Sequence, residues 1–240
     1  MISARAVEGL PEIRAGDDLA AMLAGHVQDG DVLVIAQKAV SKAEGRVVKL
    51  AGVTPSEEAK RLAAEQGKED ARHVQLILDE SQEVLRAERG VLICRTRHGF
   101  VCANAGVDAS NTEPGTVVLL PTDPDASARA LRARLGKRVG VVIADSFGRA
   151  WRHGQCDVAI GIAGLSPLDD WRGRRDPHGR ELKATWIAIA DQAAAAADLA
   201  RTKDSREPAV IVRGLEEHVT ADDGPGAAAL IRPPGEDLFR

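Results

Sequence analysis

The sequence predicts an α+β fold. Short strand-like and helix-like segments are interspersed along its 240 residues without the regular βαβ alternation that a doubly wound sheet requires. The composition is 44% hydrophobic and 28% charged, which is an ordinary globular balance. Aromatic residues are scarce, with three Trp, three Phe and no Tyr, so we expect a core built from Ala, Val, Leu and Ile.

Apolar runs bounded by turn residues give the expected strands. The first, DVLVIA at 31–36, follows a Gly30-Asp31 turn. Runs around Val84 and at 91–96, separated by 88–90, are typical of a hairpin. Further strands are expected at 116–120, 139–144, 157–163 and 209–212.

Capping signals give the expected helices. Thr54-Pro55-Ser56-Glu57 resembles a capping box with proline at the first helical position, which opens a helix through Gln66. A helix capped by Asp125 is expected to end at Gly136. Two more helices are expected, at 71–78 and, very rich in alanine, from 181 to about 202. The polar, Gly-rich stretch 167–180 is predicted to be a mobile loop.

Charge and cysteine content exclude several classes of protein. The formal net charge of −4 gives no basic footprint for a nucleic-acid partner. No apolar run is long enough to span a membrane, and no secretory leader is visible at the N-terminus. Cys94, Cys102 and Cys156 form no CxxC pair, which favours reduced thiols in a cytoplasmic protein over disulfides or a zinc site.

Familiar catalytic signatures are missing. The sequence has no Walker loop, no GxGxxG after a strand, no HExxH and no GxSxG. A bound nucleotide would therefore be held by backbone amides, lysines and metal ions.

Two aspartate-centred segments are the main candidates for a site. Asp108 lies with Asn104, Ser110 and Asn111 among small residues, and their oxygens suit Mg²⁺ or Mn²⁺, although an ordinary Asp/Asn turn explains them equally. Asp145 follows an apolar strand and Ser146 adds a second oxygen donor, with a helix N-cap as the alternative.

Basic residues near these segments suggest phosphate contacts. Arg149, Arg152 and His153 form a charged loop that either clamps phosphate or carboxylate or is simply solvated. Lys42 follows the 31–36 strand and is placed to meet phosphate, although most lysines only decorate a surface.

Together these segments resemble the coenzyme F420:L-glutamate ligase family, also called F420-0:gamma-glutamyl ligase. The matching stretches span Gly9 to Arg240: GLPEIRAGDDL, VSKAEGR, LILDES, HGFVCANAGVDASN, IADSFGRAWRHGQCDVAIGIAGLSPLDDWRG and EDLFR. The resemblance implies mixed, largely antiparallel sheets with flanking helices. It also implies one ligase unit over 1–240, with two intertwined subdomains as an open alternative and no fused nitroreductase-like domain.

The resemblance further implies a GTP-dependent enzyme that adds L-glutamate to F420-0 and uses Mg²⁺ or Mn²⁺, often with K⁺, as a homodimer with the nucleotide near the subunit interface. Its metal ligands fall on Asp108, Asp145 and Ser146, where the family commonly has Thr in place of Ser146. Its nucleotide contacts fall on Leu10, Pro11, Glu12, Ile13, Gln37, Lys42 and Asn111. Gln37 replaces a hydroxyl residue, and Arg201-Thr202-Lys203 departs from a Met-Gly-Lys of relatives.

In the reaction implied, GTP converts the acceptor carboxylate to an acyl phosphate that the glutamate amine displaces, with further glutamates γ-linked. A related carboxylate–amine ligase acting on another acid, and a non-catalytic GTP-binding regulator, remain as alternatives.

Overall fold

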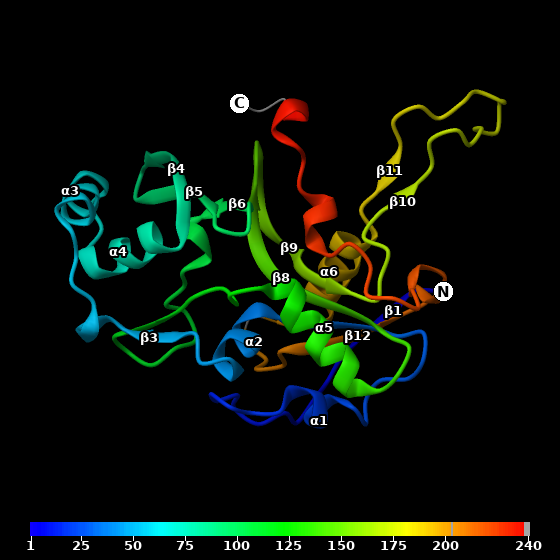
Figure 1. The fold of residues 1–240 in the computed structure, drawn as a ribbon, viewed down its shortest axis with the longest axis horizontal. Coiled ribbons are helices and arrows are strands. Elements are labelled where there is room, and N and C mark those ends of the chain that lie inside the picture. The colour runs from blue at the N-terminus through cyan, green and yellow to red at the C-terminus, as the bar shows by residue number, and fades with distance from the viewer. Residues whose placement is uncertain (203, 238–240) are drawn as a thin grey trace.

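The α+β fold is confirmed in a computed structural model, which describes residues 1–202 and 204–237. A five-stranded sheet has the order β1-β12-β2-β8-β9 (Figure 1). Its β2 and β8 pair in parallel and the other neighbours pair antiparallel. The strands are β1 (Ser3–Ala6), β2 (Val32–Ala36), β8 (Gly140–Arg149), β9 (Arg152–Ala163) and β12 (Ala209–Arg213).

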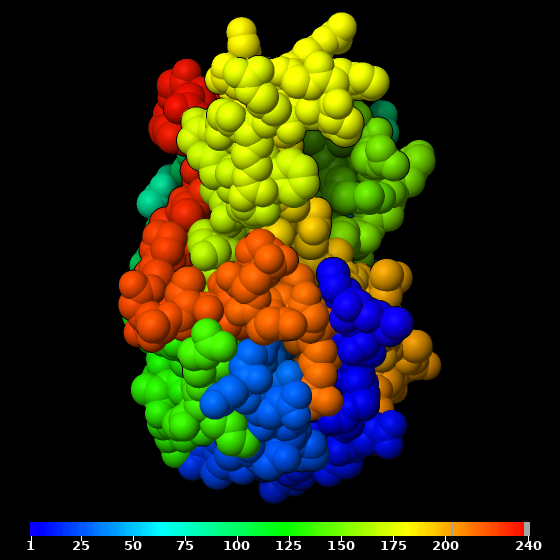
Figure 2. All heavy atoms as spheres, turned by 90° about the vertical axis from the view of Figure 1, so that its right-hand side faces the viewer, coloured from blue at the N-terminus to red at the C-terminus, as the bar shows by residue number. Residues whose placement is uncertain are grey.

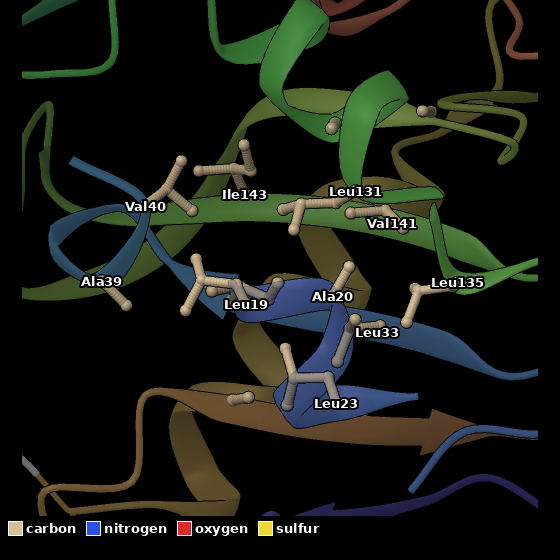
Figure 3. Packing of buried hydrophobic residues seen from close by; sticks show 14 of the residues in the cluster. Leu19, Ala20, Leu23, Leu33, Ala39, Val40, Leu131, Leu135, Val141 and Ile143 are labelled. Atoms are coloured by element: carbon tan, nitrogen blue, oxygen red, sulfur yellow. The ribbon is translucent and has the colours of Figure 1, made fainter. Parts of the chain in front are cut away.

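One face of this sheet is covered by α1 (Leu19–Leu23), α2 (Gln37–Ala43) and α5 (Pro124–Leu135). Figure 3 shows Leu19, Ala20 and Leu23 of α1 packed in one cluster with Leu33 of the sheet. Leu131 of α5 lies close to Val141 of β8 in the same view. Branched aliphatic side chains thus fill this layer, as the shortage of aromatic residues predicts.

The other face is covered by α6 (Ile189–Ala200). Ala190, Ala193, Ala194 and Ala197 of this helix are buried. Their small side chains allow the helix axis to approach the sheet closely, which explains the alanine-rich sequence.

A third apolar cluster lies in residues between α2 and α5. It is formed by α3 (Glu57–Gln66) and α4 (Ala71–Asp79), with the sheet β4-β5-β6 against them. The strands are β4 (Ser81–Glu88), β5 (Val91–Thr96) and β6 (Val101–Ala103), and the ribbon of β3 (Val47–Lys49) and β7 (Thr116–Val118) completes the region. The β4–β5 hairpin is as predicted. The expectation of one ligase unit over 1–240 stays a prediction.

A long hairpin, which we call the arm, comprises residues 167–188. It contains β10 (Asp169–Asp170) and β11 (Trp186–Ile187), and Figure 1 shows it extending away from the main sheet. Figure 2 shows a hollow between the arm and the tip of the β8–β9 hairpin. The prediction of a loop over 167–180 is therefore wrong at Asp169–Asp170, because these residues form a strand that pairs with β11.

Three predicted helix starts are wrong by a few residues or more. Ser56, not Thr54, caps α3, because its hydroxyl accepts the amide of Ala59. Asp123, not Asp125, caps α5, and Pro124 takes the first helical position. The alanine-rich helix begins at Ile189 rather than 181, because Trp186 and Ile187 pair with β10 instead. The helix ends at Gln66 and Gly136 are as predicted.

The remaining described elements are single 3₁₀ turns: η1 (Leu50–Gly52), η2 (Asn104–Gly106), η3 (Glu216–His218), η4 (Ala227–Leu230) and η5 (Pro234–Glu236). Across the described parts of the chain, none of the helices has the length and apolar character needed to cross a membrane.

Candidate functional site

Asp145 lies inside a strand, not at the end of one as predicted. Strand β8 continues to Arg149 because it pairs with β9 in a long hairpin. Its parallel neighbour β2, however, stops where Ala36 pairs with Ala144. Asp145 is thus the first residue of β8 beyond the end of β2, so β8 has no neighbour on the β2 side at this position.

A β-bulge precedes Asp145. Ile143 pairs with Gly161 but Ala144 pairs with Ala159, so Ile160 is an extra residue on β9. The amide of Ala159 donates to Asp191 Oδ1 on α6 at 2.9 Å. Bulges bend a strand and redirect its side chains, and they are common beside active sites. This bulge sets the direction of the residues that follow on both strands.

The Asp145 carboxyl is in an unfavourable environment for a negative charge. Its pKa is raised to about 6, chiefly by burial and also by the negative charges of Asp157 and Asp108, against the lowering effect of the Ser146 backbone amide and the Lys38 ammonium. A carboxylate that is partly shielded from water and close to two others favours a proton or a cation beside it.

Asp108 follows a left-handed turn. Asn104, Ala105 and Gly106 have φ angles of 53°, 52° and 73°. Such a conformation is costly for residues with a Cβ and is often found at functional sites. Asn104 Oδ1 accepts from the amide of Leu92 and from Lys68, both at 3.3 Å, which anchors the turn to β5. Backbone bonds between Asp108 and Val118 then fix the aspartate against β7.

A lysine ammonium occupies the position next to the Asp108 carboxylate. Lys38 Nζ lies 2.7 Å from Asp108 Oδ2 and also donates to the carbonyl and hydroxyl of Ser110. Burial alone would raise the pKa of Asp108, but the hydrogen bonds from Lys38 and Ser110 hold it below its usual value. Three oxygens thus converge on one positive charge.

Ser146 contacts a third aspartate. Its Oγ lies 2.5 Å from Oδ1 of Asp157, its partner on β9. The other oxygen of Asp157 accepts from Arg201 at 2.8 Å, and Asp157 is 2% exposed. Asp145 and Ser146 point to opposite faces of β8, so this contact lies on the α6 side of the sheet.

The predicted nucleotide contacts Glu12 and Lys42 are brought together. Lys42 Nζ lies 2.6 Å from Glu12 Oε1, and this hydrogen bond lowers the pKa of Glu12. Lys38 and Lys42 are four residues apart on α2, so they lie on the same face one turn apart, with Cβ atoms about 5–6 Å from each other. Helix α2 therefore carries both lysines: Lys38, which contacts Asp108 and Ser110, and Lys42, which contacts Glu12.

The other residues predicted to contact the nucleotide differ in how exposed they are. Asn111, with φ of 56°, directly follows Ser110 and is exposed. Ile13 is buried, Leu10 packs on the core and Pro11 is exposed. Gln37 is 1% exposed; its Oε1 accepts from Ser41, and its Nε2 has no hydrogen-bond partner among the residues that the structure describes.

Other candidates stand apart from these groups. Arg149 donates to the carbonyl of His153 at 2.7 Å, and both lie with Arg152 on the exposed tip of the β8–β9 hairpin rather than in the predicted loop. Lys203 of the Arg201-Thr202-Lys203 stretch, and Leu238 to Arg240 of EDLFR, lie outside the described residues.

The donor set fits a hard divalent cation. The carboxylates of Asp108 and Asp145 and the hydroxyl of Ser146 are oxygen donors of the kind that Mg²⁺ and Mn²⁺ favour, but Ser146 points to the face of β8 opposite to Asp145, so the three are not gathered at one point. The Lys38 ammonium beside Asp108 shows that a positive charge fits there. Within residues 1–202 and 204–237, no three His, Cys, Asp or Glu side chains are grouped closely enough to form a cation site by themselves. A cation would therefore need ligands beyond these carboxylates, such as water molecules or phosphate oxygens.

Sequence reasoning missed Lys38 and Asp157. The four-residue spacing between Lys38 and Lys42 was visible, and it would have paired them once α2 was recognised as a helix. Asp157 could not be found from sequence, because its position opposite Ser146 depends on the β9 register.

Comparison with known proteins identifies relatives over nearly the whole chain. The family model described as F420-0:Gamma-glutamyl ligase matches residues 9–214. A protein of Methanothermobacter thermautotrophicus named coenzyme F420:L-glutamate ligase is 44% identical, covering 100% of this chain and 99% of that protein. A protein of the same name from Methanopyrus kandleri is 48% identical, covering 95% of this chain and 94% of that protein.

Proposed function

Because the chain belongs to the F420-0:gamma-glutamyl ligase family and is thus an enzyme of the ligase class, we propose that it adds L-glutamate to coenzyme F420-0 at the expense of GTP. The observation that best supports GTP use is the arrangement on α2. Lys42 and Glu12 lie one helical turn from Lys38, Asp108 and Ser110. A nucleotide bound beside Lys42 and Glu12 would direct its terminal phosphate toward Lys38, Asp108 and Ser110.

The chemistry requires activation of the acceptor. A carboxylate does not react with an amine at neutral pH, because oxide is a poor leaving group. In the proposed reaction, an acceptor carboxylate oxygen attacks the γ-phosphorus of GTP and GDP leaves. The glutamate amine then attacks the acyl carbon of the acyl phosphate, loses a proton and displaces inorganic phosphate. Further glutamates are joined through γ-linkages.

The residues act mainly by positioning and by charge, as in other phosphoryl transfers. Lys42 would offset charge on the nucleotide phosphates, and Asn111 would contact the nucleotide beside Ser110. Asp108, Asp145 and Ser146 would hold Mg²⁺ or Mn²⁺, which would neutralise charge on the phosphates when bound. Lys38, seated on Asp108, would remain available to the same phosphates. No described side chain is assigned as the general base.

The test is a reaction with F420-0, L-glutamate, GTP and Mn²⁺, followed by mass spectrometry. Masses increased by glutamyl units, with GDP and phosphate released, support the proposal. Turnover of GTP only with a different acid would instead identify a related carboxylate–amine ligase. GTP binding without any turnover would identify a non-catalytic regulator.

Three further points belong to the proposal. Activity is expected to be higher in K⁺ than in Na⁺, which a change of counter-ion tests. A homodimer is expected, with a mass measurable by light scattering. A cytoplasmic location is consistent with three cysteines that are all free, and fractionation of the source cells would check it.

A further inference from the structure

A buried link runs from Ser146 to the end of α6. Ser146 Oγ lies 2.5 Å from Asp157 Oδ1, and Arg201 Nη2 lies 2.8 Å from Asp157 Oδ2. The side chain of Arg201 is 10% exposed and that of Asp157 is 2% exposed. Ser146, Asp157 and Arg201 therefore form a chain of polar contacts that little water can reach.

The hydrogen bond between Ser146 and Asp157 has only one possible direction. A carboxylate has no hydrogen to donate, so Ser146 must donate its single hydroxyl hydrogen to Asp157. Every other partner of Ser146 Oγ must then meet an oxygen lone pair, and so must be a donor or a cation. A hydroxyl held in this state is suited to act as a metal ligand.

Asp157 is itself held firmly. Its backbone is fixed by pairing with Ser146 across the β8–β9 ladder. Arg201, the C-cap residue of α6, reaches it while also donating to the carbonyl of Pro208 at 2.8 Å. The carboxylate is therefore fixed from both sides and has little freedom to turn away from Ser146.

We propose that Asp157 is a positioning residue for the cation ligand Ser146, because its carboxylate takes the one hydroxyl hydrogen, so that a cation would meet oxygen lone pairs, and because Arg201 links this pair to the end of α6. This inference rests on the proposed function, in which Ser146 is a cation ligand. Groups that orient metal ligands in this way typically contribute 10- to 100-fold in metal affinity.

The experiment is a titration with Mn²⁺ alone, with free Mn²⁺ followed by electron paramagnetic resonance. Asp157→Asn keeps the shape of the side chain but can donate to Ser146, and it should weaken Mn²⁺ binding about 10-fold or more. Ser146→Ala should weaken binding as well, whereas Ser146→Thr, which keeps the hydroxyl, should not. In the Ser146→Ala background, Asp157→Asn should have little further effect, because the ligand that it positions is gone.

Asp31→Asn is the matched control. Asp31 is another buried aspartate paired with an arginine, Arg213, at 2.9 Å, and it lies at the opposite end of the same sheet. Asp31→Asn should lower thermal stability but leave Mn²⁺ affinity unchanged. Arg201→Gln, which loosens Asp157 without removing it, should weaken Mn²⁺ binding by a smaller factor than Asp157→Asn.

Wild-type Mn²⁺ affinity in folded Asp157→Asn and Arg201→Gln would overturn the inference while leaving the cation site intact. The inference would also be overturned if Asp157→Asn weakened Mn²⁺ binding by the same factor in the Ser146→Ala background as in wild type. Failure of the wild-type protein to bind Mn²⁺ would instead remove the proposed cation site, and the inference with it.

Discussion

At the scale of single residues, the central feature is the concentration of negative charge around Asp145. Its carboxyl is influenced by both Asp108 and Asp157, and Asp108 has a lysine directly beside it. Such an arrangement disfavours the ionised form in the absence of a cation. The free energy of unfolding should therefore depend on pH through the ionisation of Asp145.

A pH titration of stability tests this directly. The pKa of Asp145 is raised from 3.8 to about 6, so the folded state binds its proton more tightly than the unfolded state does. Its stabilising contribution is complete below pH about 4 and is lost as pH rises through about 6. With chelator present, wild type should lose on the order of 2 kcal/mol relative to Asp145→Asn over this range, measured by urea unfolding.

The quantity that decides the test is how the free energy of unfolding of wild type, relative to that of Asp145→Asn, changes with pH. Asp145→Asn cannot titrate, so its own curve supplies the matched baseline. Parallel stability curves for the two proteins from pH 4 to 7 would contradict the environment described for Asp145.

Removal of a proposed metal ligand tests the same residues in catalysis. Asp145→Ala or Asp108→Ala should lower ligation by about 10²-fold or more, because charge on the transferring phosphoryl group loses its stabilisation. Circular dichroism would establish that each variant is folded, and GDP release would be measured by chromatography. Near-wild-type GDP release from either variant would exclude it as a ligand.

Lys38 is predicted to compete with the cation for Asp108. Lys38→Met should lower the melting temperature of the metal-free protein, because Asp108 loses its charged partner. Added Mn²⁺ should then raise the melting temperature by more than it does in wild type. An equal Mn²⁺-induced shift in the two proteins would show that the ammonium and the cation do not share this position.

At the scale of elements, α2 connects the two halves of the site. Lys38 and Lys42 lie one turn apart, and each is paired with an acid from a distant part of the chain. Lys42→Ala should raise the KM for GTP about tenfold or more, the loss expected for a charge-assisted phosphate contact. Lys60→Ala, which changes an exposed lysine on α3, is the control and should leave KM unchanged. Equal KM values for wild type and Lys42→Ala would remove Lys42 from the nucleotide site.

The β9 bulge depends on a close approach to α5. A Cβ at Gly161 would lie 2.4 Å from the backbone oxygen of Pro124, so Gly161→Ala must push the strand and the helix apart. Overpacking of this kind costs about 1–3 kcal/mol, or roughly 2–10 °C in melting temperature for a chain of this size. Gly148→Ala is the matched control on β8, since nothing lies within 4 Å of its Cβ. Equal melting temperatures for the two variants would contradict the packing described.

Local sequence patterns predicted most elements of the fold but not their extent. The apolar runs located β2, β8, β9 and β12, and the predicted helix ends at Gln66 and Gly136 are correct. The extension of β8 past Ala144 has no apolar signal, since DSFGR is polar, and it exists because β9 pairs with it. The start of α6 depends likewise on the pairing of β10 with β11, which overrides the helical preference of the preceding residues.

The site was predictable only in part for the same reason. Asp108, Asp145 and Lys42 were selected by residue type and by resemblance. The position of Asp157 depends on two register shifts, one at Ile160 and one near the hairpin tip at Gly148 and Arg149. A regular hairpin continued from the Arg149–Arg152 pair would place Gln155 opposite Ser146, so sequence alone would choose the wrong partner.

At the scale of the whole molecule, the chain brings residues from distant segments to one edge of the main sheet. The loop at 10–13, helix α2, the Asp108 turn and strand β8 all contribute. Charged groups are gathered here where β2 ends, and the three apolar clusters hold the surrounding layers in place. We propose that phosphoryl transfer from GTP to a carboxylate takes place at this position.

The most direct test is the mass of F420-0 after reaction with GTP, Mn²⁺ and L-glutamate. We expect products heavier by whole glutamyl units, with about one GDP released for each glutamate added, and lower amounts of both, by about 10²-fold or more, from Asp145→Ala. A folded wild-type protein that leaves F420-0 unchanged, or that adds glutamate equally well without GTP, would contradict this expectation.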